Sequence, residues 1–248
     1  MEKHTKEPPQ AVVLAGPNGS GKSTCAELLL PPDMTFINAD MIAQELSGER
    51  STAADLRAGR ILIERMNELT KNKRDFAIET TLATKTLLRK IESLHEEGYE
   101  SHLFFMFLPN DDLAIQRVAA RVRAGGHHVP DETVKRRYIS GLRMFFNHYI
   151  HSVDTWRLYD NSRIADPKII AWGRRGGWTE IAQPELFDRL LARWTEVDFE
   201  NSEAVDLKVK EAVRQAIAKN KKIGNSLPEW DGEQVRVVLA EDLPEDES

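Results

Sequence analysis

The chain has 248 residues, 41% hydrophobic and 30% charged, which is enough for one complete α/β domain with additions but a tight fit for two. Its net charge of −6 argues against a broad binding surface for duplex nucleic acid, which is usually basic. The single cysteine excludes an intramolecular disulfide, and no apolar run is long enough to span a membrane. The charged N-terminus has the pattern of neither a signal peptide nor an anchor, so we expect a cytoplasmic protein.

The segment after the first apolar run, residues 11–15, has the pattern of a phosphate-binding loop. Residues 16–24 fit G-x-x-x-x-G-K-[ST] and lead into a helical pattern. Glycines let backbone N–H groups turn toward phosphate oxygens, Lys22 can reach the β and γ phosphates, and the Ser23 hydroxyl can bind Mg²⁺. We therefore expect ATP or GTP to bind here with Mg²⁺, through Gly16, Pro17, Asn18, Gly19, Ser20, Gly21, Lys22, Ser23 and Thr24.

The rest of the chain alternates apolar runs with amphipathic helical patterns. Strands are expected at residues 35–37, 76–78, 102–108, 156–159 and 168–172. A long helix is expected from Asp131 to about Ser152. This alternation predicts an α/β fold in three layers, the architecture of phosphate-loop NTPases and kinases, with a mostly parallel central sheet.

The pattern also predicts how the chain is divided. We expect a kinase core over residues 11–173, with a helical lid around residues 121–140. A small α+β extension packed on this core is expected at residues 174–240. Its predicted elements are a strand at 178–181, helices at 184–194 and 205–217, and a strand at 234–239. Residues 1–10 and 241–248 are expected to be flexible tails.

Two acidic residues end predicted strands beside the loop. Asp40 closes the second strand, and ligands of α/β sheets bind at the carboxyl ends of strands. We therefore assign Asp40 as the base that takes the proton of an acceptor hydroxyl, a role compatible with capping the following helix. Glu79 ends the third run in the same way. It could hold the metal through water or grip the substrate, and the pattern does not separate these roles.

Two adjacent glycines, Gly125 and Gly126, separate two helical patterns. Such a junction predicts a hinged lid that excludes water during group transfer, with a plain helix-turn-helix as the alternative. The histidines that follow, His127 and His128, have no cysteine or carboxylate at ligand spacing. We therefore expect His127 to contact substrate or to form part of the turn, and not to bind a metal.

Arginines lie on both sides of the glycine pair. The guanidinium group matches phosphate oxygens, and closure of a lid would bring such groups over the γ-phosphate. We expect Arg121 to make this contact together with either Arg136 or Arg137. The other arginines of the segment, Arg117 among them, are expected to be solvated.

Taken together, the segments G-P-N-G-S-G-K-S-T, F-I-N-A-D, I-E-T-T-L and R-V-R-A-G-G-H-H-V-P, with R-R-Y after them, resemble the zeta-toxin family of phosphate-loop kinases over about residues 11–173. The resemblance implies a core like that of adenylate and shikimate kinases, and ATP- or GTP-dependent phosphorylation of a small molecule. In the best-known members this molecule is UDP-N-acetylglucosamine. On this resemblance Lys22 is the phosphate-loop lysine, Asp40 the base, and Glu79 and Thr81 the contacts to the sugar nucleotide.

The resemblance also makes Arg121 and one of Arg136 and Arg137 the phosphate-stabilising arginines, and it implies a toxin with a separately encoded antitoxin as partner. Residues 174–240 depart from the family, because they do not match the helices expected to frame the sugar site. The acceptor is therefore open at this stage. A kinase of nucleosides or nucleic-acid ends, and a regulatory ATPase without a dedicated acceptor, are the alternative functions.

Overall fold

The structure, a computed structural model, describes residues 8–38, 42, 52–126, 128–177, 179–195, 227–230 and 235–238. The chain divides into two compact units, Met1–Thr195 and Glu196–Ser248. In the described part of the second unit, β8 (Leu227–Trp230) and β9 (Val235–Val238) form an antiparallel pair. The helix expected at residues 205–217 lies outside the described residues.

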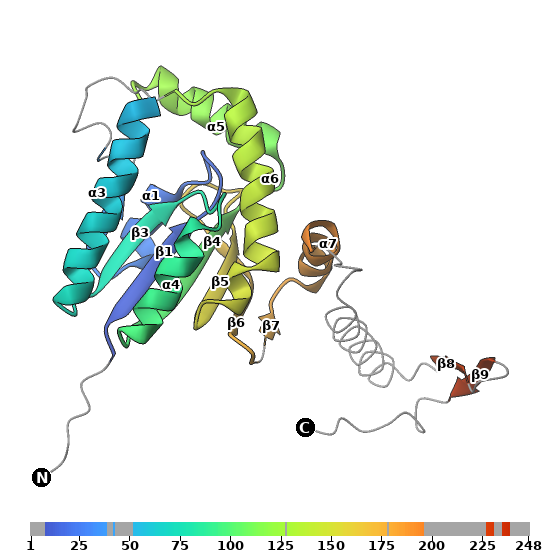
Figure 1. The fold of residues 1–248 in the computed structure, drawn as a ribbon. Coiled ribbons are helices and arrows are strands. Elements are labelled where there is room, and N and C mark those ends of the chain that lie inside the picture. The colour runs from blue at the N-terminus through green and yellow to red at the C-terminus, as the bar shows by residue number, and fades with distance from the viewer. Residues whose placement is uncertain are drawn as a thin grey trace, which may run out of the picture. The chain divides into compact units, whose positions relative to one another are not determined.

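Seven strands of the first unit form one sheet in the order β2-β3-β1-β4-β5-β6-β7 (Figure 1). The first five strands in this order are parallel to their neighbours, and β6 and β7 continue the sheet in antiparallel fashion. The expected α/β fold with a mostly parallel sheet is thereby confirmed. The strands are β1 (Gln10–Ala15), β2 (Thr35–Asn38), β3 (Phe76–Thr80), β4 (Glu100–Phe107), β5 (Thr155–Asp160), β6 (Lys168–Arg174) and β7 (Thr179–Ile181).

The antiparallel strands β6 and β7 extend past residue 173, where the kinase core was expected to end. Residue 173 falls inside β6, and β7, expected in the extension, belongs to the same sheet. The helix expected at 184–194 is present as α7 (Pro184–Trp194), and its apolar side chains join the main core. Residues 174–195 therefore belong to the first unit.

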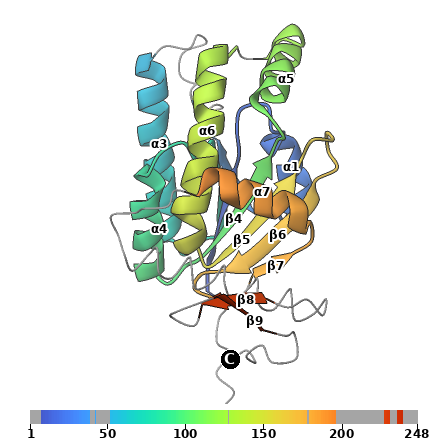
Figure 2. The same ribbon diagram turned by 90° about the vertical axis from the view of Figure 1, so that its right-hand side faces the viewer.

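The sheet has helices on both faces. Side chains alternate in direction along each strand, so a strand that is apolar throughout presents apolar side chains to both faces. In β1, Ala11, Val13 and Ala15 join the larger core cluster, whereas Val12 and Leu14 join the smaller one. The smaller cluster is completed by α1 (Lys22–Leu29). Helices that contribute to the larger cluster are α3 (Thr52–Lys71), α4 (Thr86–Glu96), α5 (Asp111–Arg123), α6 (Asp131–Asn147) and α7. Figures 1 and 2 show α3, α5 and α6 extending beyond the ends of the strands on one side of the sheet.

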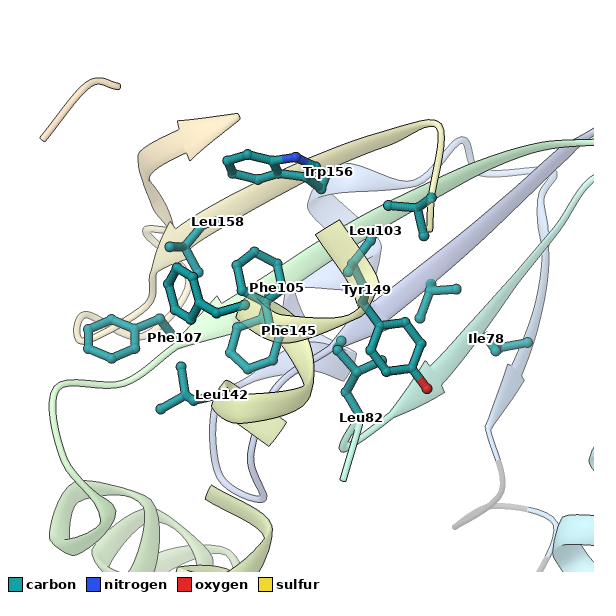
Figure 3. Packing of buried hydrophobic residues seen from close by; sticks show 14 of the residues in the cluster. Ile78, Leu82, Leu103, Phe105, Phe107, Leu142, Phe145, Tyr149, Trp156 and Leu158 are labelled. Atoms are coloured by element: carbon teal, nitrogen blue, oxygen red, sulfur yellow. The ribbon is translucent and has the colours of Figure 1, made fainter. Parts of the chain in front are cut away.

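Helix α6 supplies the centre of the larger core (Figure 3). The Phe145 ring lies 4.8 Å from the Phe105 ring and 5.9 Å from the Trp156 ring, measured between centroids. The helix is shorter than expected. It ends at Asn147, since His148 has φ −135°, and a 3-10 turn over Tyr149–His151 follows in place of the last helical turn.

Close packing fixes α6 against the end of β3. A Cβ atom at Gly141 would lie 2.7 Å from the backbone oxygen of Thr81, whereas a Cβ at Gly59 in α3 would meet nothing within 4 Å. Glycine costs a helix up to about 1 kcal/mol relative to alanine. Its presence at 141 is therefore explained by the approach of the segment that follows Glu79.

This difference predicts opposite effects of one substitution at two helical glycines. Gly141→Ala should lower the free energy of unfolding by about 1–3 kcal/mol, because the new methyl group overlaps backbone that is fixed by the core. Gly59→Ala, the matched control, should raise it by about 0.5–1 kcal/mol. Urea unfolding followed by circular dichroism measures both. A Gly141→Ala variant as stable as the unchanged protein would contradict the close approach.

A partly buried polar cluster links the N-terminal ends of β4 and β5. Asp154 accepts hydrogen bonds from the backbone and hydroxyl of Ser101, and it lies 2.9 Å from His95 Nε2. Arg175 also bonds Asp154 and donates to His95 Nδ1. Ser101 is fully buried and its bonds to Asp154 join β4 to the segment before β5. No helix among the described residues has the length and apolarity needed to cross a bilayer.

Candidate active site

The phosphate-loop sequence connects β1 to α1, as expected. Gly21 occupies the position before α1 with φ +81°, a left-handed conformation that a glycine adopts without strain. A Cβ atom at Gly16 would lie 2.5 Å from the backbone oxygen of Met106, so the loop also packs directly on the end of β4. These two positions explain why the loop needs glycine independently of any ligand.

The ammonium group of Lys22 lies folded over this loop. Its Nζ donates hydrogen bonds to the backbone oxygens of Gly16, at 2.9 Å, and Pro17, at 3.0 Å. It also lies 3.7 Å from Glu79 Oε1, and the lysine side chain is only 6% exposed. A buried charge held by carbonyls and one carboxylate is well placed to exchange these partners for phosphate oxygens.

Glu79, at the carboxyl end of β3, joins the loop to the second strand. Its Oε2 accepts hydrogen bonds from the Ser23 hydroxyl, at 2.7 Å, and from the Asn38 amide, at 2.8 Å. The side chains of Ser23 and Glu79 thus place hard oxygen donors next to each other, the kind of donor that Mg²⁺ prefers. This donor set fits the expected metal.

The loop borders a pocket of about 390 Å³. Its lining comes from the phosphate loop, the end of β3, one face of α5 and the segment after β5. The residues are Asn18, Gly19, Gly21, Lys22, Ser23, Thr24, Glu79, Arg117, Ala120, Arg121, Asn161 and Ile164. The loop, Glu79 and Arg121, which the sequence predicted separately as site residues, therefore line the same pocket.

Arg117 was expected to be solvated, and this expectation was wrong. The guanidinium donates to the backbone oxygens of Asn161, at 2.8 Å, and Ser162, at 2.6 Å. Burial lowers the pKa of Arg117, and the carboxylate of Asp160 acts in the opposite direction. Helical spacing correctly placed residues 117 and 121 on one face, but it could not show that the segment after β5 covers this face.

The arginines after the glycine pair differ in position. Arg137 Nη1 donates to the side-chain oxygen of Asn18 in the loop, at 3.2 Å, whereas Arg136 is exposed. Arg121 is exposed but lines the pocket. The geometry thus brings Arg121 and Arg137 to the loop. Contact of either with a γ-phosphate stays a prediction.

The expected lid consists of α5, a turn and α6. Gly125 has φ +85°, and the Gly126 N–H bonds the Arg121 carbonyl at 2.9 Å, which ends α5. This is the geometry of a helix-turn-helix, and hinge motion about it stays a prediction. His127 lies outside the described residues, and so does Asp40, the expected base.

The segment after Glu79 is set by the core. Leu82 has φ +56° and is 1% exposed, so a strained backbone is held by a buried side chain. Thr81, expected to contact substrate, is half-buried beside Gly141. Asn38 and Asn161 were not predicted as site residues. Each ends or follows a strand, as Glu79 does, and this position was the available signal.

A family model described as an AAA domain, AAA_33, matches residues 12–138, just over half of the chain. The chain belongs to the AAA_33 family. The matched span runs from β1 into α6 and includes the phosphate loop, Glu79, Arg121 and Arg137. The antiparallel edge and α7 of this AAA_33 protein follow the matched span.

Other comparisons found one similar sequence and several similar folds. A protein of Haemophilus influenzae, described as uncharacterized, is 30% identical over 129 residues, which are 52% of this AAA_33 chain and 92% of that protein. A chain of the AvrRxo1-ORF1:-ORF2 complex with ATP superposes with a TM-score of 0.59 at 16% identity. The match covers 74% of this chain but only 63% of that chain.

A third similar structure comes from the PezAT chromosomal toxin-antitoxin system of the human pathogen Streptococcus pneumoniae. The TM-score is 0.52 at 16% identity, with 86% of this chain and 90% of that chain covered. At such identities the structural comparisons show a shared fold. The AAA_33 match and the loop geometry together support nucleotide binding.

Proposed function

We propose that this AAA_33 protein is a kinase that transfers the γ-phosphate of ATP or GTP to a hydroxyl group of a small molecule. The observation that carries the proposal is the meeting of Lys22, Ser23 and Glu79 at a pocket bordered by Arg121. A phosphate-binding lysine, a metal-binding hydroxyl, an acidic strand end and an arginine are the parts that phosphoryl transfer requires around the nucleotide.

The nucleotide phosphates would lie in the loop. Lys22 would release the carbonyls of Gly16 and Pro17 and bind the β and γ oxygens instead. Ser23 would hold Mg²⁺ directly and Glu79 through water. When bound, Mg²⁺ neutralises negative charge on the phosphates. Arg121 and Arg137 would add positive charge near the phosphates.

The acceptor hydroxyl would be activated by Asp40, which follows Asn38 at the end of β2. The hydroxyl oxygen forms a bond to the γ-phosphorus as the bond from that phosphorus to the bridging β,γ oxygen breaks. The hydroxyl proton passes to the Asp40 carboxylate, and the nucleoside diphosphate leaves. Asn38 is bonded to Glu79, so the two strand ends that would receive acceptor and metal are joined.

We further propose that the acceptor is a sugar nucleotide such as UDP-N-acetylglucosamine, contacted by Glu79 and Thr81, and that the protein is a toxin with an antitoxin partner. The motifs of the zeta-toxin family support this proposal. So does the shared fold with a chain of the PezAT toxin-antitoxin system. The close approach of Gly141 to the Thr81 backbone would hold Thr81 in place for such a contact.

The test is incubation of the protein with ATP, Mg²⁺ and a cell metabolite extract, followed by mass spectrometry for species that gain one phosphate. We expect one dominant product, with UDP-N-acetylglucosamine as the first pure compound to try. Asp40→Asn should abolish this product while ATP binding is retained. Hydrolysis of ATP to water with no new phosphometabolite would favour a regulatory ATPase. Transfer only to oligonucleotide ends would favour a nucleic-acid kinase.

A further inference from the structure

Asn161, directly after β5, contacts the phosphate loop from a distant part of the chain. Its backbone N–H bonds the Phe107 oxygen at 3.0 Å, which continues the pairing of β5 with β4. Its side chain is 1% exposed, and Nδ2 donates to the backbone oxygen of Ser20 at 2.5 Å. A buried amide therefore holds one carbonyl of the loop, 141 positions earlier in the sequence.

Holding this carbonyl also fixes the next N–H group. The described part of the chain contains no cis peptide bond, so the C=O of Ser20 and the N–H of Gly21 point in opposite directions from one planar unit. The Ser20 oxygen faces Asn161, and the Gly21 N–H consequently faces away from it. Gly21 is one of the residues that line the pocket.

The space around Gly21 confirms how closely the two residues fit. A Cβ atom at Gly21 would lie 2.7 Å from Asn161 Nδ2, so the amide occupies the volume that any other residue would need. Gly21 thus has a packing reason to be glycine in addition to its left-handed φ. The orientation of the Ser20–Gly21 peptide depends on both the glycine and the asparagine.

Arg117 holds Asn161 in place from α5. It donates to the carbonyls of Asn161 and Ser162, and these bonds fix the segment from which the amide projects. The same helix touches the loop itself, because a Cβ at Gly19 would lie 2.6 Å from the Ala114 oxygen. The loop is therefore held by α5 at one point and by Asn161 at another.

We propose that Asn161 is a positioning residue for the nucleotide phosphates: its amide binds the Ser20 carbonyl and thereby aims the Gly21 N–H at a phosphate oxygen. This inference rests on the proposed function, since it needs the loop to bind phosphates. Asn161 is among the residues that line the pocket, but it is only 1% exposed, so this role needs no contact between its side chain and the nucleotide. Loss of the amide should weaken binding of the phosphate chain and leave binding of the nucleoside unchanged.

The experiment compares Asn161→Ala with the unchanged protein, using ATP, inorganic triphosphate and adenosine as separate ligands in titration calorimetry. The variant should bind ATP and triphosphate about tenfold more weakly or worse, the loss expected for one well-placed hydrogen bond of about 1.4 kcal/mol. Adenosine affinity should not change. In the transfer assay KM for ATP should rise more than kcat falls.

Asn147→Ala is the matched control. Asn147 Nδ2 likewise donates to backbone oxygens, of Arg143 at 2.8 Å and of Trp194 at 2.7 Å, far from the loop. Its loss should lower the melting temperature without changing triphosphate affinity. A folded Asn161→Ala variant with unchanged triphosphate affinity would overturn the proposal. If the unchanged protein binds neither ATP nor triphosphate, the proposed function fails instead.

Asn161→Asp keeps the size of the side chain but replaces the donor with an oxygen that repels the Ser20 carbonyl. It should weaken triphosphate binding at least as much as alanine does, and it serves if the alanine variant does not fold. Failure of both variants to fold, with Asn147→Ala folded, would show that Asn161 is needed for the fold alone and would overturn the proposal.

Discussion

Replacing Lys22 by alanine should lower the rate of phosphate transfer by about 10²–10³-fold or more, the scale on which loss of one preorganised electrostatic group acts. The ammonium group is nearly buried, and its partners are two loop carbonyls and Glu79. Without it, phosphate oxygens would meet these oxygens with no positive charge between them. The charge of Glu79 would also lose its closest described cation.

The measurement is transfer of labelled phosphate from ATP to the acceptor found in the metabolite screen. Lys90→Ala is the control, because Lys90 bonds Asn67 between α3 and α4 and has no part in the pocket. It should transfer phosphate at close to the normal rate. A Lys22→Ala variant that is folded and retains more than about a tenth of the normal rate would contradict the role of Lys22.

Replacing Phe145 by alanine should lower the free energy of unfolding by about 3–5 kcal/mol, a large share of the stability of an ordinary domain. The ring is fully buried and lies among Phe105, Phe146 and Trp156. Removing it leaves a cavity where α6 meets β4 and β5 (Figure 3). Neither the sheet nor the helix can collapse into this space without losing other contacts.

Urea unfolding monitored by tryptophan fluorescence measures this loss. Leu28→Ala provides the control, since Leu28 on α1 is 58% exposed and its truncation should change stability by less than about 0.5 kcal/mol. A loss below about 1 kcal/mol for Phe145→Ala would mean that the cluster does not hold α6. Because α6 also carries Arg137, a folded variant should be measured for ATP affinity as well.

The sequence predicted those parts of the site that depend on neighbouring residues. The strand, the loop and α1 are continuous in the chain, and a glycine-rich loop has few backbone conformations that end in a helix. Glu79 was predicted because it ends an apolar run, and ligands of α/β sheets bind at the carboxyl ends of the strands. The fold class followed from the same alternation of strands and helices.

Contacts to the loop from far along the chain were predicted only in part: Arg137 was one of two candidate arginines, and Asn161 was not predicted. Arg137 bonds Asn18 across 119 positions, and Asn161 bonds Ser20 across 141. Periodicity specifies one face of a helix but not its neighbour, which is why Arg117 was placed in solvent. The antiparallel direction of β6 could not be predicted either, since an apolar run has the same composition in either direction.

The two edges of the large sheet are formed by its shortest strands, β2 with four residues and β7 with three. An edge strand exposes unpaired backbone groups that can pair with a second molecule, and short edges offer few of them. The long apolar strands β1 and β4 are each paired on both sides. Within the described part of the first unit, the folded sheet thus offers another chain few backbone groups with which to pair.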